Sequence, residues 1–194
     1  MRKIFIDCGA HKGFNIGRFL ERFEDADQYE IFAFECFPDN IRELEKDYGD
    51  KCTIYEAAIS THDRYQSFTI GGTTRGGTLR NDKTMWVTQN TMMVKCMNFS
   101  KWLKENFSED DYIIVSFDIE GAEYEILESM KADDTLKYMN KFYVEFHGTK
   151  LATLNIKTEH DWIKYLKEYF KENVFINAVN NNYQLDEFKR LNQA

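Results

Sequence analysis

The chain has 194 residues, of which 43% are hydrophobic and 15% aromatic, and its formal net charge is −8. This composition excludes a disordered chain, and the length suffices for one domain with a sizeable core. The negative charge opposes unassisted binding to nucleic acid or to an anionic membrane, and no apolar run approaches membrane-spanning length. Four scattered cysteines without a C-x-x-C pair indicate reduced thiols of a cytoplasmic protein: Cys8, Cys36, Cys52 and Cys96.

The first predicted element is an apolar run at residues 4–6, which leads through Asp7, Gly9 and Gly13 into a segment with helical periodicity. The run is typical of a strand buried on both faces of a parallel sheet, and the glycines allow the backbone to approach a ligand closely. The turn lacks the G-x-G-x-x-G triplet of dinucleotide sites, and the Asp7 carboxylate would repel a diphosphate. It therefore favours S-adenosylmethionine, a cationic donor without phosphate, over NAD. A tight turn in which Asp7 is only a helix-start acid is the alternative.

A second strand is expected at residues 29–34, and it ends in Glu35. Glu35 follows Gly13 by 22 residues, close to the spacing at which an acid of the second strand meets a ribose. Because S-adenosylmethionine and NAD both contain ribose, Glu35 supports nucleoside binding without choosing between them; a surface glutamate is the alternative. A third strand is expected at residues 52–59, where the small Ala57 leaves room for an adenine ring.

Residues 61–97 break the alternation of strands and helices. Two extended pieces, roughly residues 65–70 and 92–97, flank a glycine-rich loop. Such a loop is typical of a lid or of an element that binds the acceptor. Arg75 and Thr78 could hydrogen-bond a polyhydroxylated acceptor there, and a plain exposed hairpin is the alternative.

The strand predicted at residues 112–117 ends in Asp118, at the carboxyl end where open α/β sheets bind ligands. Glu120 and Glu123 come at the start of the following helix, where negative charge is favourable, so both have a purely structural alternative. A further strand at residues 141–147 carries Glu145 and His147 two positions apart, on one side of an ideal strand.

The alternation predicts an α/β fold with a doubly wound, mostly parallel sheet. A long helix is expected to begin with a capping box at Thr158. Residues 174–178 and 183–185 are expected to form a closing hairpin that makes an antiparallel C-terminal edge. We expect residues 1–194 to form a single domain, with the hairpin and loop of about residues 61–97 as an insertion.

Four stretches together resemble the FkbM family of S-adenosylmethionine-dependent methyltransferases. They are Ile6-Asp7-Cys8-Gly9-Ala10-His11-Lys12-Gly13, Phe34-Glu35-Cys36-Phe37-Pro38-Asp39-Asn40, Asp118-Ile119-Glu120-Gly121-Ala122-Glu123 and Val144-Glu145-Phe146-His147. The resemblance implies a Rossmann-like class I methyltransferase fold and O-methylation, often of sugar hydroxyls, and glycosyltransferase domains as partners. The sequence departs from the family at Cys36, where proline is common, and at Ser116, where lysine is frequent. The absence of leading helices leaves open that the chain is one domain of a longer protein.

The expected site has a donor part and an acceptor part. The donor part comprises Asp7, Gly9, Ala10, His11, Gly13, Glu35, Cys36, Ala57 and Asp118. Arg75, Thr78 and Glu120 are expected to bind the small-molecule or glycan acceptor.

Methyl transfer to a hydroxyl requires the protein to align the acceptor and to remove its proton. His147 has the intrinsic pKa best suited to a base, with Asp118 and Glu145 beside it. Alternatively, Asp118 and Glu145 hold Mg²⁺, which lowers the pKa of the hydroxyl. In a third interpretation Glu145 and His147 are structural.

Three rival functions share part of this pattern. An NAD-dependent oxidoreductase would share the fold and Glu35, but it leaves residues 118–123 unexplained. RNA 2′-O-methylation shares the chemistry, but the net charge of −8 and the lack of a basic aromatic stripe argue against it. A non-catalytic nucleoside-binding or scaffold domain is the alternative from a different class.

Overall fold

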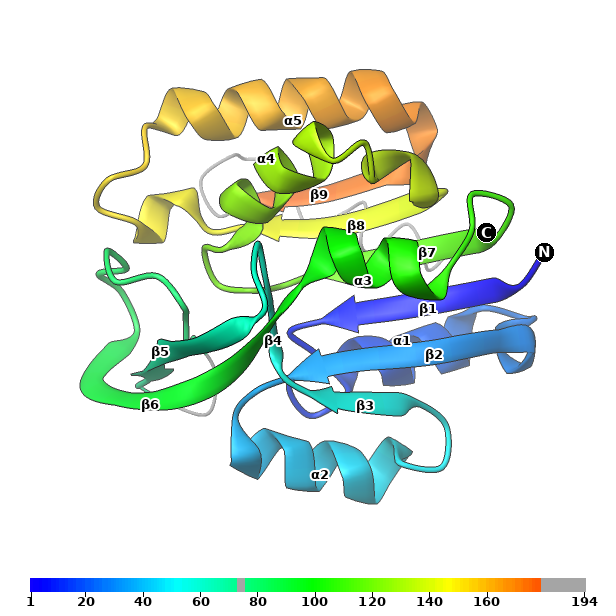
Figure 1. Ribbon diagram of the computed structural model, residues 1–194, viewed down its shortest axis with the longest axis horizontal. Helices are drawn as coiled ribbons and strands as arrows, with labels where there is room; N and C mark the ends of the chain where they lie inside the picture. Colours follow the sequence, from blue (N-terminus) through cyan, green and yellow to red (C-terminus); the bar gives the residue numbers. More distant parts are fainter. Residues whose placement is uncertain (73–75, 179–194) are drawn as a thin grey trace.

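The computed structural model describes residues 1–72 and 76–178. Within these residues, six parallel strands form the main sheet in the order β3-β2-β1-β7-β8-β9 (Figure 1). They are β1 (Lys3–Cys8), β2 (Tyr29–Glu35), β3 (Thr53–Glu56), β7 (Tyr112–Phe117), β8 (Lys141–Phe146) and β9 (Val174–Ala178). The strand order reverses between β1 and β7, which is where doubly wound sheets place a ligand.

Helices cover both faces of this sheet (Figure 1). One face carries α1 (Phe14–Arg22) and α2 (Pro38–Tyr48), and the other carries α3 (Phe99–Asn106), α4 (Glu123–Ala132) and α5 (Ile156–Phe170). Strand β1 is buried on both sides, because Ile4 and Ile6 face the core under α3 to α5 while the Phe5 ring stacks on Phe19 of α1 at 4.2 Å. The predicted doubly wound α/β sheet is therefore confirmed. No helix of the described residues combines the length and apolar character needed to cross a membrane.

The third predicted strand, residues 52–59, is wrong as a single element. β3 pairs with β2, whereas β4 (Ala58–Ser60) pairs with β6 in a second sheet. The break falls at Ala57, which is buried and donates its N–H to the carbonyl of Tyr55. Strand-forming residues continue through the break, so the pattern could not show that the chain changes partners there.

The second sheet of the described residues has the order β4-β6-β5. Strands β5 (Arg64–Gly71) and β6 (Val87–Asn98) are antiparallel and correspond to the two extended pieces expected within residues 61–97. The inner face of this sheet buries Phe68, Val94 and Cys96 together with Leu79 of the connecting loop. The hairpin lies beyond the carboxyl ends of β1 and β2, so it faces the ligand-binding edge of the main sheet (Figure 1).

The last helix and the sheet edge differ in detail from the sequence prediction. Helix α5 begins at Ile156 with Asn155 as its N-cap, whose Oδ1 accepts the Lys157 N–H at 2.9 Å. Thr158 lies inside the helix, so the predicted capping box is wrong. Because α5 returns the chain to the amino end of the sheet, β9 runs parallel to β8. The antiparallel partner expected at residues 183–185 lies outside the described residues, and that edge stays a prediction.

Candidate active site

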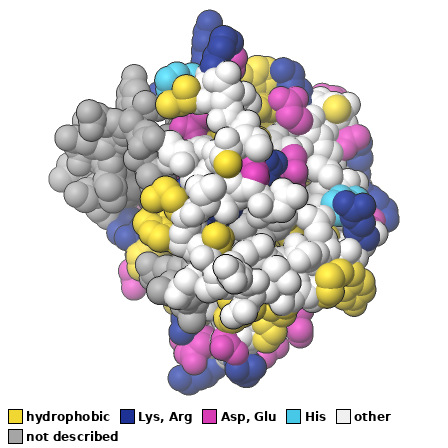
Figure 2. All heavy atoms as spheres, turned by 90° about the vertical axis from the view of Figure 1, so that its left-hand side faces the viewer, with side chains coloured by type: hydrophobic (Ala, Val, Ile, Leu, Met, Phe, Trp, Pro, Cys, Tyr) yellow, Lys and Arg dark blue, Asp and Glu magenta, His cyan; other side chains and the backbone are white. Residues whose placement is uncertain are grey.

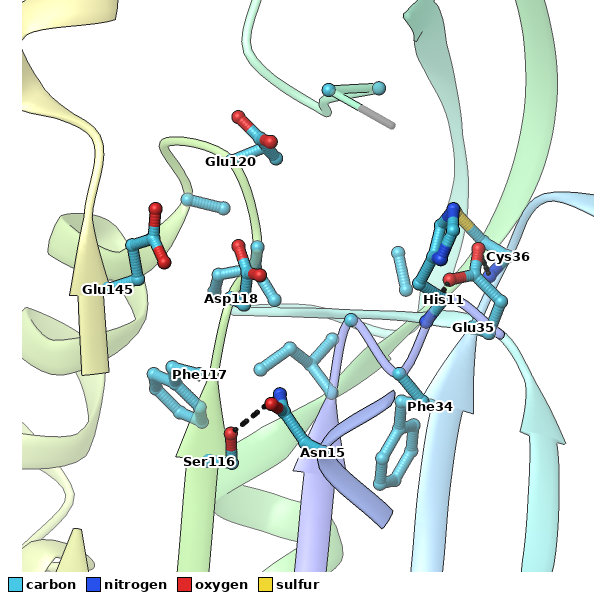
Figure 3. A pocket seen from close by; sticks show the side chains of 18 of the residues that line it. His11, Asn15, Phe34, Glu35, Cys36, Ser116, Phe117, Asp118, Glu120 and Glu145 are labelled. Atoms are coloured by element: carbon cyan, nitrogen blue, oxygen red, sulfur yellow. Dashed lines mark hydrogen bonds between the residues drawn. The ribbon is translucent and has the colours of Figure 1, made fainter. Parts of the chain in front are cut away.

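A cavity of about 930 Å³ opens at the carboxyl ends of β1, β2, β7 and β8, and residues of the β5–β6 hairpin line its other side. Figure 2 views this end of the molecule, where acidic side chains flank a basic one near the centre. In the close-up of Figure 3, His11 and Glu35 lie on one side of the cavity, and Asp118, Glu120 and Glu145 lie on the other. The volume is in the range typical of small-molecule sites.

The two glycines after β1 have different roles. Gly9 lines the cavity with a φ of +81°, and a Cβ there would lie 2.0 Å from the carbonyl oxygen of Asp118. Gly13 has a φ of +85° and lies outside the lining, and a Cβ there would lie 2.4 Å from the ring of Tyr48. Gly9 therefore lets the turn approach the exit of β7, while Gly13 lets α1 pack against α2.

Glu35, at the end of β2, is fixed by the backbone of the neighbouring turns. Its Oε2 accepts the His11 N–H at 2.8 Å, and its Oε1 accepts the N–H groups of Cys36 and Phe37 at 2.9 and 2.7 Å. Burial raises the pKa of Glu35, and the backbone donors oppose that rise. These bonds hold the carboxylate at the wall of the cavity.

Asp7 lies beneath the cavity and is absent from its lining. The carboxylate is fully buried, and its Oδ1 accepts from Nδ2 of Asn15 at 3.3 Å. The same amide nitrogen lies 3.4 Å from Oγ of Ser116 (Figure 3). Burial raises the pKa of Asp7 to about 7. Asp7 therefore orients Asn15, which does line the cavity, and does not itself face a ligand.

Asp118 follows β7 and faces the cavity, with 43% of its side-chain surface exposed. Its N–H donates to the carbonyl of Cys8 at 3.0 Å, which fixes it beside the exit of β1. Burial between the cavity walls raises the pKa of Asp118 to about 7; His147 opposes the rise, and Glu145 and Glu120 add to it. Asp118 can therefore exchange a proton near neutral pH, as a general base must.

His147 follows β8, is 1% exposed and lies behind the cavity lining. Its Nδ1 is 2.8 Å from Oε1 of the buried Glu123. Its Nε2 is 3.5 Å from carboxylate oxygens of Asp118 and Glu145 and 3.6 Å from Glu120. Burial lowers the pKa of His147, but Glu123 and the other carboxylates outweigh it and raise the pKa to about 10. The imidazole is protonated at neutral pH and does not line the cavity, whereas Asp118 does, so Asp118 is better placed than His147 to act as the base.

Glu120 connects the hairpin loop to the exit of β7. Its Oε2 accepts from Nζ of Lys83 at 2.7 Å and from Nζ of Lys150 at 2.9 Å. Lys83 also donates to the carbonyl of Gly76 at 2.6 Å, and Oγ1 of Thr78 donates to the carbonyl of Glu120 at 2.8 Å. Thr78 is buried outside the cavity lining, so it holds the loop in place and does not face an acceptor.

Three side chains bring a possible metal ligand atom within 4.8 Å of one another: Asp118, Glu120 and His147. Their state does not favour a divalent cation, because Glu120 is already paired with two lysines and His147, protonated in the absence of a metal, would have to lose that proton to become a ligand. The predicted ligand pair of Asp118 and Glu145 would have to bind the cation beside this charged imidazole. The residues present therefore favour proton transfer without a metal.

The structure brings together most of the residues that the sequence predicts for the site. Those that line the cavity are Gly9, Ala10, His11, Glu35, Cys36, Ala57, Asp118, Glu120 and Glu145. Those that lie behind the lining are Asp7, Gly13, Thr78 and His147, and Arg75 lies outside the described residues. Among the lining residues that were not predicted from the sequence are Asn15, Arg18, Trp86 and Lys150. Asn15 and Arg18 are three apart on α1, a spacing that places them on one face, but only the packing of α1 shows that this face reaches the cavity.

A doubly wound parallel sheet with a glycine turn after β1 and an acid at the end of β2, both at one cavity, is the arrangement of a Rossmann-like methyltransferase domain. The family model of the methyltransferase FkbM domain matches residues 7–182, and the chain belongs to the FkbM methyltransferase family. The resemblance seen in the sequence is thereby confirmed. Family membership supports an enzyme that transfers methyl groups, and it sets the NAD-dependent oxidoreductase aside.

Among solved structures, the crystal structure of methyltransferase FkbM from Methylobacillus flagellatus KT matches this chain with a TM-score of 0.52 and 11% sequence identity. The match covers 86% of this chain and 37% of that chain, so the present chain spans well under half the length of that protein. At this identity the likeness concerns the fold alone. A search of curated proteins finds no match.

Proposed function

We propose that this domain is an S-adenosylmethionine-dependent O-methyltransferase that methylates a hydroxyl of a sugar or glycan. The observation that carries the proposal is Asp118, whose carboxylate faces the cavity beside Gly9 and has a pKa of about 7. A base with this pKa is half ionised at neutral pH and suited to accept a proton. An alcohol is a poor nucleophile and needs such a base, so the position of Asp118 supports a hydroxyl as the acceptor.

The lining of the cavity supports a nucleoside with a cationic sulfonium as the donor. Glu35 offers a carboxylate for ribose hydroxyls, and Ala57 leaves space for a base next to it. The carboxylates of Asp118 and Glu145 favour a cation and disfavour a diphosphate. The donor supplies an already activated methyl group, so the protein has to bind, orient and deprotonate the acceptor.

In the proposed step the acceptor hydroxyl gives its proton to the Asp118 carboxylate as its oxygen forms a bond to the methyl carbon. The bond between that carbon and the donor sulfur breaks, and the sulfur keeps the electron pair. His147 remains protonated 3.5 Å behind Asp118, where its charge favours the ionised carboxylate. Glu123 holds the imidazole in this orientation through Nδ1.

The hairpin side of the cavity supports a sugar as the acceptor. Trp86 lines the cavity with 62% of its surface exposed and has Nζ of Lys150 at 4.4 Å from its ring centroid, and Glu145 and Asn177 provide hydrogen-bonding groups in the same lining. A flat aromatic face beside polar groups suits a ring that carries hydroxyls. Glycosyltransferases, the partners that the resemblance implies, would supply such an acceptor.

The proposal is tested by calorimetric titration of the protein with S-adenosylmethionine and NAD, followed by transfer of a labelled methyl group to a panel of sugars and glycans. We expect the protein to bind S-adenosylmethionine and not NAD. We also expect the labelled methyl group to be found as a methyl ether on one class of glycan. Binding of S-adenosylmethionine without methyl transfer to any hydroxyl would support a non-catalytic scaffold domain instead. Binding of NAD alone would refute the assignment of S-adenosylmethionine as the donor.

We predict that Glu35→Ala raises the dissociation constant of S-adenosylmethionine at least about tenfold, since both a ligand contact and three backbone bonds depend on this carboxylate. Calorimetry measures the change. Glu30→Ala is the matched control, because Glu30 is an exposed acid of the same strand whose nearest cation, Arg2, is 3.9 Å away. Equal affinities of the two variants would exclude Glu35 from the donor site.

We predict that the rate of methyl transfer in excess EDTA stays within about twofold of the untreated rate, because general-base catalysis of this kind needs no metal. The paired lysines of Glu120 and the charge of His147 are the structural reasons. The measurement is the initial rate with labelled donor, with and without EDTA and then with added Mg²⁺. A rate that EDTA abolishes and Mg²⁺ restores would support the metal-assisted alternative.

A further inference from the structure

Arg18 is a cation in the cavity lining that neither the sequence motifs nor the proposed chemistry uses. It lies on α1, three residues after Asn15, and both side chains line the cavity. No ion pair joins Arg18 to a carboxylate in the part of the chain that the structure describes, although four acids line the same cavity. A guanidinium that is left unpaired beside a ligand cavity is available for an anionic group of the ligand.

The guanidinium is held in place by an aromatic ring. Its central carbon lies 4.0 Å from the centroid of Phe14, which is 58% exposed and also lines the cavity. A cation over a ring face is attracted to it and loses little of its hydrogen-bonding capacity, because the N–H groups point outward in the plane of the guanidinium. Arg18 therefore keeps its donors for a partner in the cavity.

Asn15 provides the complementary group one turn earlier on the helix. Its Nδ2 donates to Asp7 and lies within 3.4 Å of Ser116, so the amide is oriented from beneath the cavity. With the nitrogen committed in this way, its Oδ1 remains as a hydrogen-bond acceptor. An acceptor and a guanidinium three residues apart on one helix face match the ammonium and the carboxylate of an α-amino acid.

We propose that Arg18 binds the carboxylate of the methionine part of the donor, and that the Asn15 carbonyl oxygen receives its ammonium group. The inference rests on the proposed function. It assigns residues to the amino-acid part of the donor, whereas Glu35 is assigned to the ribose. The cavity then presents an acid for the ribose at β2, an acid near the sulfonium at β7, and an arginine for the carboxylate at α1. S-adenosylmethionine carries its diol, cation and carboxylate in that order along the molecule.

The test combines a protein variant with a truncated ligand. Wild type, Arg18→Ala and Arg18→Lys are titrated with S-adenosylmethionine, with S-adenosylhomocysteine and with 5′-methylthioadenosine, which keeps the nucleoside and the thioether but lacks the amino acid. We expect Arg18→Ala to weaken both amino-acid-bearing ligands by about 10-fold to 100-fold and to leave 5′-methylthioadenosine within about twofold, the size expected for a charge-assisted bond. Arg18→Lys should fall between the two, because an ammonium cannot form the two-point contact.

Arg22→Ala is the matched control, since Arg22 lies on the last turn of the same helix and is absent from the cavity lining. Unchanged affinity of Arg18→Ala for S-adenosylmethionine would overturn the inference, and so would an equal loss for all three ligands, which would indicate a structural role. A higher KM for the acceptor with an unchanged donor affinity would also overturn it, by assigning Arg18 to an anionic acceptor. Failure of the wild type to bind S-adenosylmethionine would instead refute the proposed function, and the inference with it.

Discussion

Replacing Asp118 with asparagine is expected to lower kcat about 1,000-fold, within the range that general-base catalysis contributes. Asparagine keeps the size of the side chain but cannot accept a proton, and the open position of Asp118 at the cavity makes it the group that meets the hydroxyl. The dissociation constant of S-adenosylmethionine should change less than about tenfold, since 43% of the Asp118 side-chain surface is open to the cavity and solvent there screens its attraction to a cation. Single-turnover rates and calorimetry measure the two quantities separately.

Two other variants make the Asp118 result specific. Glu145→Gln removes a neighbouring carboxylate of the same cavity and should slow turnover far less, because Glu145 lies beside Asn177 and its pKa is lowered, chiefly by the hydrogen bond from His147. Asp110→Asn alters an exposed aspartate before β7 and should have no effect. If Glu145→Gln is the more damaging variant, the base is Glu145 and the assignment of Asp118 is wrong.

The pH profile gives an independent reading of the same group. Burial raises the pKa of Asp118 to about 7, and only the ionised carboxylate can act as a base. The kcat/KM of the wild type should therefore be constant above pH 8 and should fall about tenfold per pH unit below pH 6. The residual activity of Asp118→Asn should lack this fall. A wild-type profile that is flat between pH 6 and 8 would exclude a base with this pKa.

The sheet was predictable because its strands are buried on both faces. Mostly apolar runs predicted strands at residues 29–34 and 112–117, and β2 and β7 begin and end within one residue of those bounds. The two wrong predictions, a single strand at residues 52–59 and a capping box at Thr158, concern places where the structure depends on a distant strand or on another capping residue. At Ala57 the strand pairing changes, because β3 before it pairs with β2 and β4 after it pairs with β6. At the start of α5 the N-cap is Asn155, three residues before Thr158.

The site was predictable where residues follow the strands and less so where they lie within them. Glu35 and Asp118 lie at or just beyond the strand ends, and the carboxyl ends of parallel strands meet at one edge. Asp7 lies within β1, where the alternation of side chains directs it under α1. The protonation of His147 depends on carboxylates from two strand exits and from α4, which residue type alone cannot reveal.

Replacing His147 with alanine is expected to reduce the free energy of unfolding by about 3–5 kcal/mol at pH 7, the cost of leaving one partner of a buried ion pair alone. The partner is Glu123, whose side chain is fully buried and whose Oε1 lies 2.8 Å from Nδ1 of His147. Glu123 also accepts the N–H groups of Ile119 and Gly121, so the loss of the imidazole should loosen the turn that carries Asp118. Urea unfolding followed by circular dichroism measures the change.

Paired variants separate the lost charge from the lost volume. The double variant Glu123→Gln with His147→Ala should be more stable than His147→Ala alone, because no buried charge remains without a partner. His160→Ala, at an exposed position of α5, should change the free energy of unfolding by no more than about 0.5 kcal/mol. A double variant that is less stable than either single variant would contradict the ion pair.

The pH dependence of this stability has a definite sign. The pKa of His147 is raised from 6.5 in the unfolded chain to about 10 in the fold. The stabilisation from its charge is therefore fully present below pH 6.5 and is lost as the pH rises through 10. The difference in the free energy of unfolding between wild type and His147→Ala should accordingly shrink from pH 7 to pH 10, leaving only the packing contribution of the ring. If the difference in the free energy of unfolding stays constant over this range, the imidazole is already neutral at pH 7. His147 would then be a candidate for the catalytic base again.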